Sequence, residues 1–124
     1  MAEETNLNTQ AIDAVRATLS VHQEAESKLG DIIARKNLLG QPIDRENRLR
    51  ASASRQISHY NRRLAELEAA AVVTSAPTVE EVQEVQGFIA AVKNLAVADA
   101  MVDAGFAVIR EAMSRSSEVA SKAG

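Results

Sequence analysis

The amino-acid sequence predicts an all-α fold, an antiparallel up-down-up bundle of three helices, and three observations lead to this prediction. The chain is rich in alanine, together with leucine, glutamate and arginine, which favour helices because they lose little side-chain freedom there. The alternating β-branched and aromatic residues that are typical of strands are absent. Glycine and proline interrupt the chain within residues 38–44 and 74–78, which leaves three long segments with helical periodicity.

The length of 124 residues favours one helical domain, residues 1–124, which is large enough to bury a core. The sequence contains no cysteine, so it offers no disulfide and no thiolate metal site, and this suits a reducing compartment. The first ten residues lack the basic start and apolar run of a secretory signal, and we expect a cytoplasmic protein. The first eight residues and the last six are expected to fray.

The first predicted helix spans residues 9–39. Its inward stripe, at spacings of three and four residues, consists of Ile12, Val15, Leu19, His22, Glu26, Leu29 and Ile33. Gly30 is followed by Asp31, a pair that can end one helix and cap another, so a kink is expected there.

The second predicted helix spans residues 44–73 and has the clearest periodicity. Its stripe consists of Leu49, Ala53, Ile57, Tyr60, Leu64, Leu67 and Ala71. Short connections on either side predict that neighbouring helices run in opposite directions.

The third predicted helix spans residues 78–117 and begins with a capping box, in which Thr78 caps the free amides and Glu81 reaches back. Its stripe consists of Val82, Val85, Ile89, Val92, Leu95, Val102, Phe106, Ile109 and Met113. The stripe drifts between heptad registers, which favours a compact bundle over a long coiled coil. Lys93, Asp99 and Asp103 interrupt the most apolar stretch and argue against a membrane span. Three narrow stripes make a thin core, so dimerisation into a larger bundle stays open.

One face of the second helix is basic. On a helical wheel at about 100° per residue, a continuous band on the exposed side consists of Arg45, Arg48, Arg55, His59, Arg62 and Arg63. We predict that this band binds a protein partner with an acidic surface. The same arginines binding phosphates of a nucleic acid is the alternative, and a merely solvated helix face is the third interpretation.

Three observations weigh against nucleic acid. The whole chain has a net charge of −3, and Tyr60 belongs to the core stripe, so no aromatic residue on the basic face can stack on bases. No motif that reads nucleic-acid sequence surrounds the arginines.

A three-helix bundle would also separate charge along its length. The end that holds the first turn would gather Arg35, Lys36, Arg45, Arg48, Arg50, Arg110 and Arg115. The opposite end would gather Glu3, Glu4, Asp13, Glu66, Glu68, Glu80, Glu81 and Glu84. Such poles steer and orient partners, including further copies of the chain, more than they add stability.

Two polar residues, His22 and Glu26, interrupt the stripe of the first helix. In an antiparallel hairpin His22 lies level with Tyr60, and Glu26 lies near Arg50 or Arg55. We interpret His22, Glu26 and Tyr60 as a structural polar layer that fixes register. A metal or acid/base site built from His22, Glu26 and His59 is the alternative, but zinc needs three or four ligands and the wheel points His59 outward.

No motif for phosphate binding, nucleophilic catalysis or zinc hydrolysis occurs in the sequence. The i, i+4 pair of Asp99 and Asp103 has no third ligand in view and is expected to be solvated. We therefore predict a non-enzymatic protein without metal or cofactor, acting as an adaptor, an inhibitor or immunity-type factor, or an assembly subunit.

Overall fold

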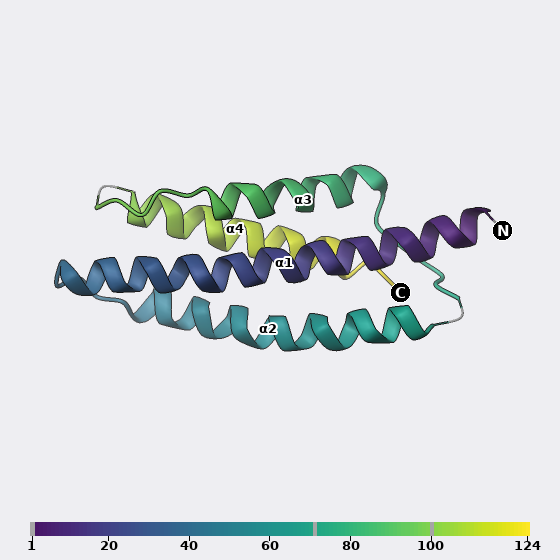
Figure 1. The fold of residues 1–124 in the computed structure, drawn as a ribbon, viewed down its shortest axis with the longest axis horizontal. Coiled ribbons are helices and arrows are strands. Elements are labelled where there is room, and N and C mark those ends of the chain that lie inside the picture. The colour runs from purple at the N-terminus through teal and green to yellow at the C-terminus, as the bar shows by residue number, and fades with distance from the viewer. Residues whose placement is uncertain (1, 71, 100) are drawn as a thin grey trace.

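The computed structural model contains four helices and no strand within the residues that it describes, which are 2–70, 72–99 and 101–124, with side chains from residue 7 onward (Figure 1). The helices are α1 (Ala2–Leu38), α2 (Asp44–Ala69), α3 (Val79–Lys93) and α4 (Val102–Ala120). The all-α class is confirmed, whereas the prediction of three helices is wrong.

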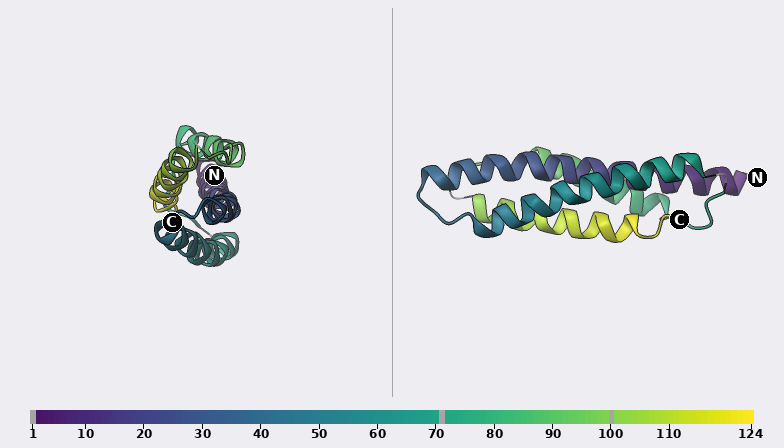
Figure 2. Two further views of the ribbon diagram at one scale, coloured as in Figure 1. Left: turned by 90° about the vertical axis from the view of Figure 1, so that its left-hand side faces the viewer. Right: turned by 90° about the horizontal axis from the view of Figure 1, so that it is seen from below.

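Helix α1 is the centre of the bundle. It packs against each of the other three helices, α3 packs on α4, and α2 and α4 make little contact with each other. Figures 1 and 2 show α2 returning along α1, and α4 returning along α3. The packing places Val21, Ala25 and Leu29 of α1 in the larger core, and Val15 and Leu19 in a second core that lies under Tyr60 and Leu67 of α2.

The segment predicted as one helix over residues 78–117 is two helices, because the chain leaves helical geometry after Lys93 and turns back. The ammonium group of Lys28 on α1 donates to the carbonyl of Leu95 at 3.0 Å and satisfies an acceptor near the end of α3. The reversal lets the apolar faces of both α3 and α4 pack on α1, so that Val85, Val92 and Ile109 are fully buried. The break, over residues 94–101, covers most of the seven-residue step between Leu95 and Val102 in the predicted stripe.

The turn between α1 and α2 has the glycine that its geometry requires. Gly40 has φ of +69°, a conformation that residues with a Cβ rarely adopt. The amide of Gly40 donates to the carbonyl of Asn37 at 3.1 Å, and that of Gln41 donates to Lys36 at 2.9 Å. These two bonds form a Schellman motif that ends α1.

Helix α1 continues through Gly30, so no helix ends there and Asp31 caps no new one. The guanidinium of Arg50 from α2 lies over this glycine, and a Cβ at Gly30 would stand 3.0 Å from its Nη2 atom. The end of the Arg50 side chain would therefore have to shift for any larger residue at this position.

The ends of the chain also differ from the prediction. Helix α1 is already formed at Ala2, and α2 ends at Ala69, before the predicted stripe residue Ala71, which lies outside the described residues. Gly124 is hydrogen-bonded to Thr74 and Ser75 at 3.2 and 3.0 Å, so the last residues are held against the α2–α3 connection. No described helix is long and apolar enough to cross a membrane.

Candidate functional site

The predicted basic band occupies one side of α2, but its six members have different environments. Arg48, Arg55, His59 and Arg62 are exposed, and no carboxylate among the described residues lies within ion-pair distance of them. These four residues are the part of the band that is open to a partner.

Arg45 and Arg63 instead make contacts within the protein. Arg45 pairs with Glu46 and Asp103, and its guanidinium lies 4.3 Å from the centre of the Phe106 ring. Arg63 donates to the carbonyl of Ala123 at 2.9 Å and pairs with Glu66. The two arginines thus connect α2 to α4 at one end and to the last residues of the chain at the other.

A groove lies between these two connections, because three hollows there are each lined by residues of α2 together with residues at or near α4. Figure 2 shows these two helices side by side, with α1 behind them. The middle of this α2–α4 groove is a hollow of about 210 Å³. We call it the central hollow; it is lined by His22 of α1, by Leu49, Ser52 and Gln56 of α2, and by Arg110, Met113, Ser114 and Ser117 of α4. Further hollows continue the groove toward Arg48 at one end and toward His59 at the other.

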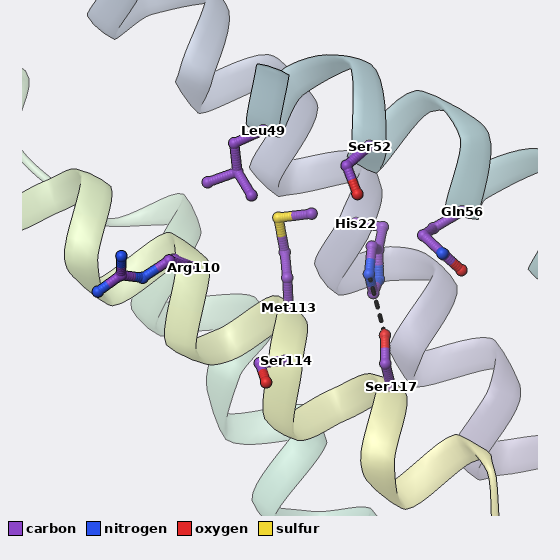
Figure 3. Close-up of a pocket in the computed structure, with 8 residues that line it drawn as sticks. All are labelled: His22, Leu49, Ser52, Gln56, Arg110, Met113, Ser114 and Ser117. Carbon is purple, nitrogen blue, oxygen red and sulfur yellow. Dashed lines mark hydrogen bonds between the residues drawn. The ribbon is translucent and has the colours of Figure 1, made fainter. Parts of the chain in front are cut away.

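The central hollow has an apolar part and a polar part (Figure 3). Leu49 and Met113 point toward each other across the groove, while Ser52, Gln56 and Ser117 surround the ring of His22. The guanidinium of Arg110 points away from His22, toward Phe106, whose ring centre lies 5.7 Å from it.

His22 forms the floor of the polar part and is only 1% exposed. Its Nδ1 lies 2.8 Å from the carbonyl oxygen of Thr18, which can only accept, so Nδ1 carries a proton. In the neutral ring Nε2 is then an acceptor, and the hydroxyl of Ser117 donates to it at 3.4 Å. Burial lowers the pKa of His22, and the hydrogen bond to Thr18 opposes this only in part.

The other members of the predicted polar layer are brought together only in part. The rings of His22 and Tyr60 lie 5.3 Å apart, so the predicted pairing of these two residues is present. Glu26 is half-buried and shares a surface hollow with Arg50, as the predicted position implies, but no ion pair joins them. The ring centres of His59 and Tyr60 lie 4.9 Å apart in an edge-on arrangement, and His59 is exposed.

The predicted basic pole is wrong in part, because the prediction assumed one long third helix. The reversal after α3 carries Asp99 and Asp103 to the end with the α1–α2 turn, where Asp99 pairs with Arg35 and Asp103 with Lys36 and Arg45. Asp99 and Asp103 are therefore not merely solvated, and they neutralise much of the expected basic pole.

At the opposite end Arg115 of α4 meets three glutamates. Its Nη2 lies 2.9 Å from Glu84, and it also contacts Glu81 and Glu118. The hydrogen bond from Arg115 holds the pKa of Glu84 below its usual range. A hydrogen bond from Lys122, with others from Thr78, lowers the pKa of Glu81 to about 2.

Within the described residues no group of three or more His, Cys, Asp and Glu side chains is arranged to hold a metal ion. Comparisons with known protein families, with curated proteins and with solved structures find no match to this chain.

Sequence reasoning identified the α2 side of the groove but missed the α4 side. Arg110, Met113 and Ser117 face α2 only because α4 is a separate helix. The i, i+3 and i, i+4 spacing of Phe106, Arg110, Met113 and Ser117 was visible as one stripe. The helix that this stripe faces could not be predicted as long as residues 78–117 were expected to form one helix.

Proposed function

We propose that this chain is a non-enzymatic protein-binding module that contacts an acidic surface of a partner protein through the exposed basic face of α2. The observation that carries the proposal is the set of Arg48, Arg55, His59 and Arg62, which are exposed beside an open groove and have no acid partner within the described residues.

The contrast with several basic residues elsewhere in the protein supports this proposal. Four of these residues each pair with a carboxylate of the same chain, namely Arg35, Lys36, Arg45 and Arg115. A protein with more acids than bases, 17 against 14, has enough carboxylates to neutralise every base, yet this face of α2 is left without them. Unpaired cations on a rigid helix raise the rate and specificity of binding to an acidic surface.

A nucleic acid is the alternative, because the same arginines could contact phosphates. Two observations count against it. The chain is acidic overall, and the ring of Tyr60 is buried on the inner side of α2, whereas stacking on bases needs an accessible ring.

The test is fluorescence anisotropy with a labelled glutamate-rich helical peptide and, separately, a labelled DNA duplex. Measurements at about 50 mM salt, where charges are weakly screened, and at about 300 mM salt, where they are strongly screened, show how much of the binding is electrostatic. We expect the peptide to bind and the duplex not to bind. Arg55→Glu with Arg62→Glu should weaken peptide binding at least about tenfold, because reversal replaces attraction by repulsion.

Arg50→Glu with Lys93→Glu is the matched control. It makes the same change in net charge, at exposed positions that lie off this face, and it should leave the affinity within about twofold. Tight duplex binding that the double reversal abolishes would favour the nucleic-acid alternative. Equal loss of peptide binding in both double variants would show only an effect of net charge and would contradict the proposal.

A further inference from the structure

The α2–α4 groove is long enough to hold one helix of a partner protein. It is bridged at one end by Arg45, which contacts Asp103 and Phe106, and at the other by Arg63, which donates to the carbonyl of Ala123. The 18-residue interval of α2 between the two bridges corresponds to about 27 Å at about 1.5 Å per residue, or roughly five helical turns. Two neighbouring helices with a third behind them leave a groove that a fourth helix can fill.

The lining of the central hollow indicates what such a helix must carry. Leu49 and Met113 offer an apolar contact, and the small residues Ser52, Ser114 and Ser117 on the two sides allow a close approach. No carboxylate lines this hollow, whereas the hollow near the α1–α2 turn includes Asp44, Glu46 and Asp103.

One cation lines the central hollow, and a second lines the adjoining hollow toward the α1–α2 turn. Arg48 lies on α2 and Arg110 on α4; both are exposed, and neither has a carboxylate within ion-pair distance in the described part of the chain. Acidic side chains that flank an apolar anchor would meet these cations, so the charge of the groove is complementary to such an arrangement.

We infer that the α2–α4 groove binds an acidic amphipathic helix of a partner protein, with an apolar side chain of that helix seated in the central hollow against Leu49 and Met113. The inference rests on the proposed function and adds the shape of the partner, its apolar anchor and the role of α4. Arg48 and Arg110 pair with acids on the two edges of the bound helix, and the hydroxyls of Ser52 and Ser117 lie beneath it. This is the helix-in-groove mode of recognition.

The experiment uses two labelled peptides of 18 residues with identical composition. In the first, leucines form one helical stripe between glutamates; in the second, the same residues are scrambled so that no stripe remains. We expect the striped peptide to bind at least about tenfold more tightly, because a buried leucine adds apolar contact that the scrambled peptide lacks.

Ser52→Phe fills the central hollow without changing any charge, and Ser54→Phe, on the other flank of the same helix, is its matched control. Ser52→Phe should remove the preference for the striped peptide, while Ser54→Phe should keep it. Arg110→Gln should lower the affinity for the striped peptide several-fold, and Arg50→Gln should leave that affinity unchanged. Circular dichroism melts show that each variant is folded before binding is measured.

The outcomes separate this inference from the function on which it rests. Equal affinity for both peptides, unchanged by Ser52→Phe, would overturn the docked helix and leave electrostatic binding by α2 intact. Failure of both peptides to bind would contradict the proposed function, which is the binding of an acidic partner protein. If Ser52→Phe does not fold, the test is the comparison of Arg110→Gln with Arg50→Gln. Equal losses of affinity for the striped peptide in these two variants would contradict the role of α4.

Discussion

The ammonium group of Lys36 lies 2.8 Å from Oε2 of Glu46, and both side chains are buried where α1 turns into α2. Lys36 also contacts Asp103 at 3.1 Å, so this ion pair joins α1, α2 and α4. The hydrogen bond that Lys36 donates to Glu46 raises the pKa of Lys36. Burial alone would raise the pKa of Glu46, but the hydrogen bonds from Lys36 and Arg45 outweigh burial and lower it.

Removing one partner of this pair should be costly. We expect Lys36→Met to lower the free energy of unfolding by about 3 kcal/mol, because it leaves the buried Glu46 carboxylate without its nearest cation. Combining it with Glu46→Leu should recover part of that loss. Urea denaturation measures the free energy of unfolding of the single and the double variant. Lys93→Met, at an exposed position, is the control, with an expected change within about 0.5 kcal/mol. A loss no larger than that of the control would contradict the structural role of the pair.

His22 should make the stability of the fold depend on pH below neutrality. Because burial lowers its pKa in the folded state, the unfolded chain binds the proton more readily. The free energy of unfolding should therefore fall as the pH drops below about 6.5, the usual pKa of histidine. His22→Gln should reduce this slope between about pH 6.5 and pH 5, and His59→Gln should keep it, since the exposed ring of His59 faces water. Denaturation curves across that range measure the slope; equal slopes in the parent and His22→Gln would count against the buried neutral ring.

The capping box at the start of α3 gives a separate prediction. The hydroxyl of Thr78 accepts from the amide of Glu81 at 3.1 Å, and the Glu81 carboxylate accepts from the amide of Thr78 at 3.0 Å. Thr78→Ala should cost about 1 kcal/mol of unfolding free energy, whereas Thr78→Ser should cost little. Similar losses in the alanine and serine variants would show that the hydroxyl does not act as a cap.

Glu81 should also contribute to acid unfolding. Its pKa falls to about 2 in the folded protein from about 4.5, chiefly through the hydrogen bond from Lys122. Stability from this carboxylate is therefore present above about pH 4.5 and is lost as the pH falls toward about 2. Glu81→Gln should flatten that part of the stability curve, and Glu80→Gln is the neighbouring control. A curve for Glu81→Gln that follows the parent curve would contradict the lowered pKa.

How much the sequence could predict is clearest at the three chain reversals, which join α1 to α2, α2 to α3 and α3 to α4. The first was predicted because Gly40 and Pro42 interrupt helical periodicity, and the capping box at Thr78 was predicted from its two residues. The break after Lys93 was missed because residues 94–101 contain neither glycine nor proline, and alanine there favours a helix. Tertiary packing on α1 overrides that local preference.

The missed break had consequences for the candidate site. With residues 78–117 as one helix, Arg115 belonged to the wrong end of the molecule and Asp103 had no partner. Arg110, Met113 and Ser117 could not be placed opposite α2 either. The basic face of α2 was predictable because it depends on a single helix, whereas the groove depends on how two distant helices pack.

The central claim, that an acidic partner helix binds between α2 and α4, is tested most directly by NMR chemical-shift mapping. The ¹⁵N-labelled protein is titrated with the striped acidic peptide, and amide shifts are followed along the whole chain. We predict that the largest shifts lie on facing sides of α2 and α4, around Ser52, Gln56, Arg110 and Ser114. The largest shifts on α3, or an even spread over all exposed basic residues, would contradict the claim.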